Sequence, residues 1–419
     1  MAEQVITEKT MDTGLSATSG LPVAPTQTKS VIKFKTKSKP ADVRNFHPKI
    51  ISLQESGNRL EMEILDVDRS VVNSIRRTIL TNIPILVFKG FPHSENRIEF
   101  SKNTSKFNNE YLKHRIQCIP IHISDETKFE TMVENYAVKL KVVNDTNEQR
   151  YVTTKDFILV NIKNGKPVGD DDLRKLFPPD PISNDYIPIC VLMPKISETD
   201  EPEEIEATIH FSIGNANEDS CWNVVSKCTM FDKQDETQIQ KYKLTEEYKR
   251  KSEMEKRDFD LLDAQRMVLK NHYVFKMDTL GIYTNQEILL KSTQYLIDKM
   301  TDFLYYLANK ATLNPVKIGV HEDFTLSKDS ASVRDKYSLK IEFDDYTIGG
   351  LIENHLYQMF RKELLYVAFE KDHPHEIYCN ILFSYRNENV PIETIVFQLT
   401  QVGNELIHIY KTIQSYLRK

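Results

Sequence analysis

Two apolar stripes constrain this chain more than any other feature of its sequence. One lies near the C-terminus, where apolar residues recur every three or four positions without a break: Ile392, Ile395, Leu399, Val402, Leu406, Ile409, Ile413 and Tyr416. Pro391 suits the first turn of such a helix. The second stripe, about 100 positions earlier, has the same spacing: Leu289, Thr293, Leu296, Met300, Phe303 and Leu307. Stripes this regular need a partner helix along their length. They predict two long helices that pair between the halves of the chain, with ordinary packing inside one domain as the alternative.

A strand and a shorter helix are predicted where the structured sequence begins. The alternation of Leu60, Met62 and Ile64 indicates a strand with one buried face. Four apolar residues at helical spacing follow it: Val71, Val72, Ile75 and Ile79. Asp68 is placed to cap this helix and Pro84 lies just beyond its end.

Two adjacent arginines, Arg76 and Arg77, lie on that helix. Neighbouring residues are about 100° apart around a helix, so both cannot point into one buried face. At least one guanidinium is therefore expected outside, available to a carboxylate or carbonyl of a partner. Two solvated surface arginines are the alternative.

Changes in residue composition along the chain predict its domains. A length of 419 residues suits two or three domains. Residues 1–47, rich in Ser, Thr, Gly, Pro and then Lys, predict a disordered tail. The first folded half takes residues 48–95 and 186–310, with a charged helical insertion at 232–270. Residues 96–185 form an inserted domain. A linker at 311–335, long enough to span up to roughly 80 Å, leads to a last domain at 336–419.

Charge and cysteine content narrow the function classes. The formal net charge of −6 argues against a protein that mainly grips nucleic acid. The five cysteines are scattered without CxxC spacing, which predicts reduced thiols inside a cell rather than disulfides or a zinc site. We also expect no membrane span and no secretory signal peptide.

Two short motifs resemble catalytic or metal sites but fit structural roles better. The GDDD run at 169–172 follows turn residues and precedes LRKLF, so it predicts a turn and the acidic first turn of a helix. His373-Pro374-His375 supplies two metal ligands without a third, and a turn between strands is the better interpretation. No nucleotide-binding, zinc-protease or serine-hydrolase motif occurs. We predict no catalytic and no metal-binding residues.

The order of several segments resembles a known family. The helix with N-S-I-R-R-T-I-L at 73–80, then HRIQCIPI at 114–121, CWNVVSKCTMF at 221–231 and FKMDTLGIYTNQEILLKSTQYLIDKM at 275–300 resemble the third-largest subunit of RNA polymerase II, the archaeal D subunit and, more distantly, bacterial α. The resemblance implies that Arg76 and Arg77, with His114 and Arg115 at the start of a return strand, contact the second-largest polymerase subunit.

The last 90 residues resemble a second member of that family. FDDYTIGGLIENHL at 343–356 and VAFEKDHPHEIYCNILF at 367–383 are similar to the eleventh subunit, archaeal L. Asp345 is a candidate N-cap there, and the apolar face comprises Ile348, Leu351, Ile352, Met359 and Phe360. In most relatives the two subunits are separate chains that form a heterodimer. Their fusion resembles the arrangement in certain large DNA viruses.

The resemblance implies an α+β fold with two α-like dimerisation modules of antiparallel strands and packing helices, the first split by an inserted domain. Helix 70–82 is expected against 347–362, and helix 286–307 against 391–417. The residues expected to make this intramolecular pairing are Val71, Val72, Ile75, Ile79, Ile348, Leu351, Ile352, Met359, Leu296, Met300, Leu399 and Leu406.

The implied function is that of a non-catalytic assembly subunit of a DNA-directed RNA polymerase. Its expected partners are the second-largest and largest subunits and small accessory subunits, with DNA reached only through the complex and no membrane. We expect no cofactor, because residues 122–189 lack the cysteines that bind zinc or an iron–sulfur cluster in some relatives. Such a protein would work in a nucleus if cellular, or in a viral factory or virion if viral. The alternatives are a stand-alone nucleic-acid-binding transcription factor using the basic stretch 29–49 and a helix predicted at 241–272, and an independent nucleotidyltransferase using GDDD.

Overall fold

The computed structural model describes residues 46–195, 197, 201–309, 324–329, 336–342 and 346–418. Of the predicted tail at 1–47, residues up to 45 lie outside these residues, as do most of the predicted linker and the Asp345 cap. The predicted end of the tail at residue 47 is wrong, because Phe46 is buried in the hydrophobic core. The fold is mixed α and β, as predicted, and every strand pair that the structure describes is antiparallel. Among the described helices, none combines the length and apolarity needed to cross a bilayer.

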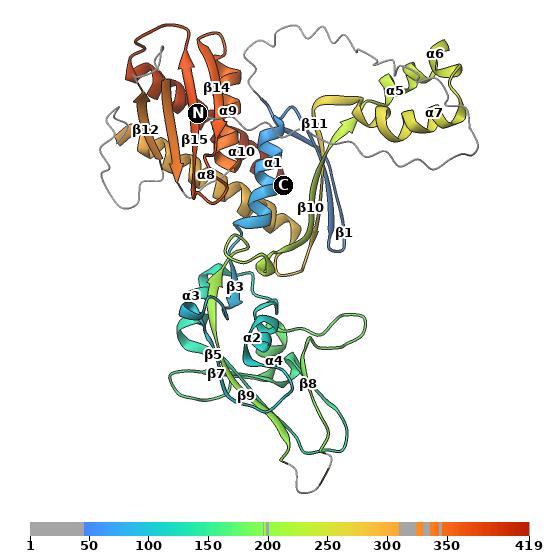
Figure 1. Ribbon diagram of the computed structural model, residues 1–419, viewed down its shortest axis with the longest axis vertical. Coiled ribbons are helices and arrows are strands. Elements are labelled where there is room, and N and C mark those ends of the chain that lie inside the picture. The colour runs from blue at the N-terminus through green and yellow to red at the C-terminus, as the bar shows by residue number, and fades with distance from the viewer. Residues whose placement is uncertain are drawn as a thin grey trace, which may run out of the picture. The chain divides into compact units, whose positions relative to one another are not determined.

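The first half is built on a four-stranded sheet of order β1-β2-β11-β10 (Figure 1). Its elements are β1 (Lys49–Ser56), β2 (Arg59–Leu65), β10 (Val225–Gln234) and β11 (Val268–Thr279), with helices α1 (Arg69–Thr81) and α8 (Asn285–Asn309). Leu60, Met62 and Ile64 are all buried, which confirms the predicted one-sided strand. The predicted helix cap is also confirmed, because the Asp68 side chain accepts a hydrogen bond from the Ser70 backbone N–H.

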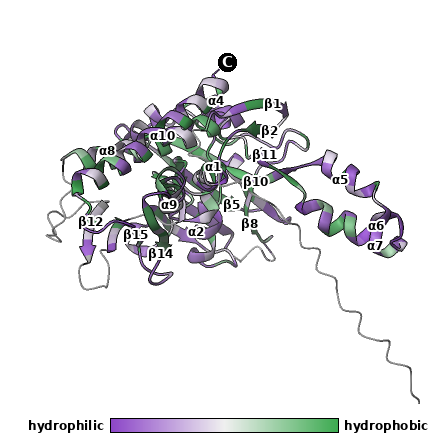
Figure 2. Ribbon diagram, turned by 90° about the horizontal axis from the view of Figure 1, so that it is seen from above, coloured by the Kyte–Doolittle hydropathy of each residue, from purple (hydrophilic) through white to green (hydrophobic). Residues whose placement is uncertain are grey.

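The second half repeats this plan with a sheet of order β12-β13-β15-β14. Its elements are β12 (Phe324–Asp329), β13 (Lys336–Glu342), β14 (Leu364–Glu370) and β15 (Tyr378–Tyr385), with helices α9 (Tyr346–Phe360) and α10 (Ile392–Leu417). His373 and His375 lie in the turn between β14 and β15, as predicted. The ribbons of α8 and α10 carry both hydrophobic and hydrophilic residues, as amphipathic helices do (Figure 2).

The predicted linker at 311–335 is wrong in part, because β12 lies inside it. Leu326 is fully buried and is the register partner of Leu339 in β13. Its backbone N–H also donates to the Tyr306 hydroxyl, 2.8 Å away on α8. A six-residue edge strand with one inward apolar side chain has too little pattern to be distinguished from a linker in the sequence.

The inserted lobe, residues 85–214, has its own sheet and core. The sheet has the order β3-β9-β5-β7, with β4 also paired to β9, and β6 pairs with β8. The strands are β3 (Ile85–Phe88), β4 (Ile98–Asn103), β5 (Tyr136–Asn144), β6 (Arg150–Thr153), β7 (Phe157–Asn161), β8 (Pro188–Leu192) and β9 (Glu203–Gly214). The helices are α2 (Asn109–Gln117), α3 (Phe129–Asn135) and α4 (Asp170–Leu176), with single turns η1 (His93–Glu95), η2 (Glu126–Lys128) and η3 (Thr154–Asp156).

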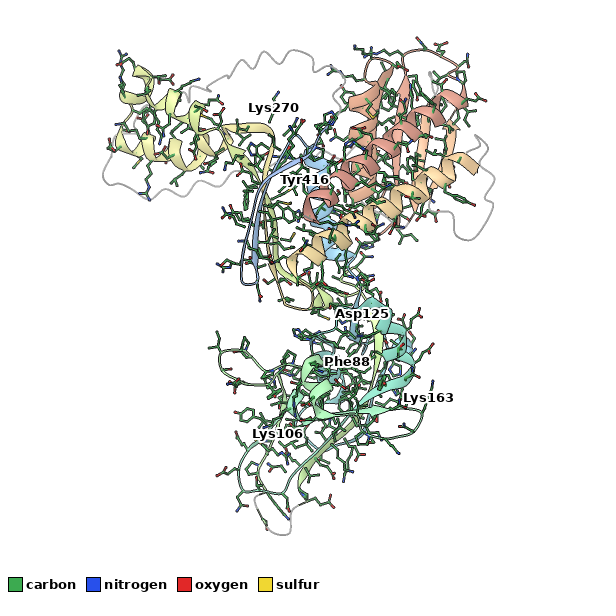
Figure 3. All side chains as sticks on the ribbon, turned by 180° about the vertical axis from the view of Figure 1, so that it is seen from behind. Phe88, Lys106, Asp125, Lys163, Lys270 and Tyr416 are labelled. Carbon is green, nitrogen blue, oxygen red and sulfur yellow. The ribbon has the colours of Figure 1, made fainter. Side chains whose placement is uncertain are left out.

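The predicted limits of this lobe, 96–185, are too narrow. Strand β3 lies between two cores, since Ile85 and Val87 face the core of the first half while Leu86 and Phe88 face the core of the lobe. Phe88 lies among the lobe's side chains in Figure 3. Because successive side chains of a strand point to opposite faces, a run such as ILVF serves both cores at once. Composition alone cannot locate a boundary inside such a strand.

The charged insertion is a helical finger, residues 235–267, between β10 and β11. It contains α5 (Glu236–Lys243), α6 (Glu246–Lys249), α7 (Glu253–Asp258), the π-helix η5 (Phe259–Asp263) and the turn η6 (Ala264–Arg266). A single helix over 241–272 is therefore wrong. Thr245 and Ser252 each cap a new helix, so the segment is divided into short pieces. A small core of Ile239, Phe259, Ala264 and Met267 holds them together.

Candidate site for helix pairing and partner binding

The two halves share one hydrophobic core, which we call the shared core. It contains residues of β2 and β11 from the first half, β13 and β15 from the second, and the helices α1, α8, α9 and α10. Of the twelve predicted pairing residues, Met359 is partly buried against this core. The other eleven are buried in it: Val71, Val72, Ile75, Ile79, Leu296, Met300, Ile348, Leu351, Ile352, Leu399 and Leu406.

Helices α1 and α9 pack in antiparallel directions, because the N-terminal end of α1 meets the C-terminal end of α9 and the reverse. At the N-terminal end of α1, the Asp68 carboxylate accepts hydrogen bonds from the side-chain amides of Asn354 and Gln358. Near the C-terminal end, Arg77 Nε donates to Thr347 Oγ1 at 2.8 Å. The Arg77 guanidinium also lies 5.8 Å from the centre of the Tyr346 ring. Arg77 is thus engaged by the second half of the same chain.

The long helices α8 and α10 also pack in antiparallel directions along their stripes. Near the end of α10, Gln414 Nε2 donates to Thr293 Oγ1 at 3.2 Å. Further along, Gly403 faces Leu304 so closely that a Cβ atom on Gly403 would lie 2.8 Å from Leu304 Cδ2. The glycine therefore permits a close approach of the two backbones at this crossing.

A buried hydroxyl pair joins α1 to α10. Ser74 Oγ and Tyr410 Oη lie 2.7 Å apart, and both side chains are buried. Burial raises the pKa of the Tyr410 hydroxyl well above its usual value, so it remains protonated and able to donate. Sequence reasoning missed this pair and the amides of α9. The available signal was the presence of polar residues on or beside stripes that are otherwise apolar.

Arg76 is half-buried and its Nε donates to Asn73 Oδ1 at 2.9 Å. Burial raises the pKa of the Cys228 thiol on β10 to about 12, while the charge of nearby Arg76 acts in the opposite direction. Within the described part of the chain, the terminal guanidinium nitrogens of Arg76 have no hydrogen-bond or ion-pair partner. The terminal nitrogens of Arg77 have no such partner among the described residues either, but Arg77 faces Thr347 and Tyr346 of the second half. Arg76 is therefore the one of the two arginines that α9 does not engage, which leaves its guanidinium available to a carboxylate.

His114 and Arg115 lie on helix α2, so the predicted return strand at this position is wrong. Asn108 caps the helix, and Leu112 and Ile116, four positions apart, are buried beneath it. His114 is exposed, whereas Arg115 Nη2 donates to the Pro188 carbonyl at 2.8 Å. These two residues belong to the inserted lobe, and Arg76 and Arg77 belong to the shared-core helices. The four predicted contact residues therefore come from two structural units.

The inserted lobe is tied to the first half through Gln117 at the end of α2. Its Oε1 accepts from the Gly90 N–H at 3.0 Å, and its Nε2 donates to Asp219 Oδ2 at 2.6 Å. Its carbonyl accepts from the indole N–H of Trp222 in the turn η4 (Ser220–Trp222) at 3.2 Å. A buried residue with two such side-chain bonds and one to its backbone carbonyl fixes the end of α2 against the turn that leads into β10.

The three consecutive aspartates occupy the first turn of α4, which confirms the predicted helix start. Asp170 pairs with Arg174 at 3.2 Å and Asp172 with Lys175 at 3.1 Å. These local, solvent-facing ion pairs are typical of a helix N-terminus. In the described residues, no cluster of three or more His, Cys, Asp or Glu side chains has an arrangement suited to a metal ion.

Comparison with known proteins gives similarity over part of the chain. Across 87 residues, 21% of its length, it is 32% identical to a protein of Dictyostelium discoideum named DNA-directed RNA polymerases I and III subunit rpac1. Across a stretch of the same length it is 30% identical to the human and bovine RPAC1 subunits of that name. These stretches cover 22–23% of those proteins, so the chain spans less than a quarter of the length of the curated relatives it matches. No protein-family model matches.

Part of the chain is thus homologous to α-like RNA polymerase subunits. The antiparallel sheets and packed helices are consistent with the fold of that subunit class.

Proposed function

We propose that this chain is a non-catalytic assembly subunit of a multisubunit DNA-directed RNA polymerase, in which two α-like halves pair within one polypeptide. The observation that carries the proposal is the shared core. Two sheet-and-helix units of the same plan, far apart in sequence, bury helices α1, α8, α9 and α10 against one another. The partial similarity to RPAC1 supports a polymerase as the setting.

Fusion of the two halves makes their pairing intramolecular. Joining two modules in one chain can give them an effective concentration on the order of millimolar. Pairing then needs no diffusional encounter between separate subunits. We propose that the resulting platform recruits the second-largest polymerase subunit first, and that the largest and the accessory subunits follow. The platform itself needs no metal or other cofactor for this role.

We further propose that Arg76 is the centre of the contact with the second-largest subunit. Its Nε is held by Asn73, so the guanidinium is oriented before a partner arrives. A guanidinium held in this way loses less conformational entropy on binding a carboxylate than that of a free surface arginine. In this proposal Arg77 instead helps to pair the two halves, because its side chain already contacts Thr347 and Tyr346.

The test compares Arg76→Glu with Arg77→Glu in the full-length chain. Arg76→Glu should leave the chain folded and its halves paired but reduce co-purification of the second-largest subunit at least tenfold. Arg77→Glu should mainly lower the melting temperature, because it places a carboxylate where Thr347 and Tyr346 receive a guanidinium. Undiminished recruitment by the Arg76 variant would remove that residue from the contact.

A broader experiment tests the polymerase assignment itself. The tagged full-length chain is purified gently from its native host, and stoichiometric partners are identified by mass spectrometry. Two very large chains at one copy each are the expected result. Recovery with nucleic acid alone, with binding that weakens linearly in the logarithm of salt concentration, would support a nucleic-acid-binding factor instead.

A further inference from the structure

Asp68 caps helix α1 within the first half. Its Oδ1 accepts from the Ser70 backbone N–H at 2.8 Å and from the Ser70 hydroxyl at 2.6 Å. This is the usual arrangement at a helix N-terminus and by itself needs no partner from elsewhere.

The same carboxylate also accepts two hydrogen bonds from the second half. Asn354 Nδ2 donates to Oδ1 at 2.5 Å, and Gln358 Nε2 donates to Oδ2 at 2.9 Å. Asn354 and Gln358 are four positions apart on α9, so they occupy the same face of that helix. Gln358 Nε2 also lies 3.0 Å from Asn354 Oδ1, which fixes the two amides relative to each other.

Asp68 depends on these donors because it is only 8% exposed. Within the described residues, no lysine, arginine or histidine forms an ion pair with it. A buried carboxylate that loses hydrogen-bond donors keeps its desolvation cost without compensation. The burial of the Asp68 carboxylate in the folded chain is therefore compensated only when α9 presents amides at two positions.

The apolar part of the α1–α9 contact has little selectivity of its own. It is made by aliphatic side chains on both helices, including Val72 and Ile75 on α1 and Leu351 and Ile352 on α9. Cores of this kind accept many aliphatic partners of similar volume. Selectivity must come from groups that are costly to leave unpaired.

We infer that Asp68 is the residue that makes α1 selective for α9, by requiring two amide donors that only a correctly aligned α9 presents. A helix shifted in register, or a second α1, would bury the carboxylate without Asn354 and Gln358. This inference deepens the proposed function, on which it rests, because it names a specificity determinant of the pairing of the two halves.

The test exchanges donor and acceptor between the halves of the full-length chain. Asp68→Asn keeps an N-cap of nearly equal quality, but its amide NH₂ group now faces the Gln358 amide. Gln358→Glu places two carboxylates against each other. The double variant restores a match in reverse, because the amide introduced at position 68 can donate to the carboxylate introduced at position 358. Gln401→Glu, on an exposed position of α10, adds the same charge away from the contact.

We expect the change in melting temperature caused by Asp68→Asn to have opposite signs in the wild-type and Gln358→Glu backgrounds. Asp68→Asn should lower the melting temperature by about 1–4 °C in the wild-type background, and should raise it in the Gln358→Glu background. In the Gln401→Glu background it should act as in the wild type. If Gln358→Glu alone fails to fold, recovery of folded protein in the double variant is the same rescue.

An equal effect of Asp68→Asn in all three backgrounds would reduce Asp68 to a helix cap and overturn the inference. This outcome is distinguishable from failure of the proposed function. A chain that shows the sign reversal but recruits no polymerase subunit contradicts the proposed function and leaves the pairing determinant intact. A chain that recruits the subunits without the reversal contradicts only the inference.

Discussion

The hydroxyl of Ser74 on α1 lies 2.7 Å from the hydroxyl of Tyr410 on α10, although 336 positions separate them in the chain. Ser74 Oγ also donates to the Val71 carbonyl at 2.6 Å, so its lone pairs are left to accept the Tyr410 proton. Both side chains are buried, and an unmatched hydroxyl is costly in such a place. It therefore links correct placement of α10 to the folding of the first half.

Removing either hydroxyl should reveal that link. Tyr410→Phe should lower the free energy of unfolding by about 1 kcal/mol, because Ser74 keeps its bond to Val71. Ser74→Ala should cost more, about 1–3 kcal/mol, because it leaves the Tyr410 hydroxyl buried without an acceptor. Urea unfolding of both single variants and the double variant gives the coupling energy.

The double variant should be little less stable than Tyr410→Phe alone, since no hydroxyl is then left unmatched. Tyr357→Phe, at a half-exposed position of α9, is the matched control and should change stability by less than about 0.5 kcal/mol. Strictly additive losses would show that the two hydroxyls do not interact.

Gly403 allows a test of the close approach of α10 to α8. Gly403→Ala places a Cβ 2.8 Å from Leu304 Cδ2. The overpacking should cost about 1–3 kcal/mol, partly offset by the roughly 1 kcal/mol that alanine gains over glycine in a helix. We expect a net loss of stability of up to about 2 kcal/mol, measured by urea unfolding.

Gly350→Ala on α9 is the matched control, because no atom lies within 4 Å of the Cβ position there. This variant should be more stable than the wild type by about 0.5–1 kcal/mol. If both variants gain stability equally, Gly403 is not needed for the approach of α10 to α8.

The long amphipathic helices were predictable because their signal repeats over many turns. A stripe of eight residues in α10 and a cap such as Asp68 are local features that the sequence displays directly. The hydrophobic pairing residues follow from the same stripes. What the sequence does not display is which polar residue meets which, since Asp68 and Gln358 are 290 positions apart.

Two predictions are wrong for reasons that are also local: the return strand at 114–121 and the limits of the inserted lobe. The segment 114–121 combines the last turn of α2, where Ile116 is buried, with an apolar extension through Ile119 and Ile121. The return strand at this position is implied by the resemblance alone, and the apolar residues of the segment do not contradict it. In β3, successive residues serve two different cores, so a single apolar run crosses a domain boundary without any change in composition.

Stability should depend on pH through His355 on α9. The residue is 1% exposed, and its Nδ1 lies 3.0 Å from the Leu351 carbonyl, to which it donates. Burial lowers the pKa of this imidazole below its ordinary value of 6.5, while the charges of Asp68 and Glu405 and the bond to Leu351 act in the opposite direction. The folded chain therefore holds His355 neutral at pH values where the unfolded chain binds a proton.

The direction of the pH dependence follows from this difference in pKa between the folded and the unfolded chain. Above about pH 6.5 neither state binds the proton, and the contribution to stability is complete. As pH falls through 6.5 towards the lowered pKa, the unfolded state gains protons first, so the free energy of unfolding falls by up to about 1.4 kcal/mol per pH unit. His355→Asn should flatten this part of the curve, measured by urea unfolding from pH 8 to pH 5. His93→Asn, at an exposed position, should leave the slope unchanged, and an unchanged slope in the His355 variant would contradict the assignment.

The helical finger should be removable without loss of the platform. Its ends meet in the sheet, where Gln234 of β10 is the register partner of Val268 of β11 and the Asp235 N–H donates to the Met267 carbonyl at 2.8 Å. Replacing residues 235–267 with Asn-Gly, a common two-residue hairpin turn, should therefore preserve β10 and β11. The apolar groups of the finger bury one another, as shown by the Tyr242 ring stacked 4.7 Å from Phe259. Their removal leaves no gap in the shared core, so the melting temperature should stay within about 2 °C of the wild type.

A point variant separates the finger's own folding from that of the platform. Phe259→Ala removes the centre of the small core and should abolish hydrogen-exchange protection in α5 and α7 while protection in α8 and α10 stays unchanged. A fall of the melting temperature by about 10 °C or more on deletion would instead make the finger part of the main core. Under the proposed function, loss of a polymerase subunit from purified complexes of the deletion variant would indicate a contact with the finger. Its exposed side chains include Leu244, Met254, Leu261 and Leu262.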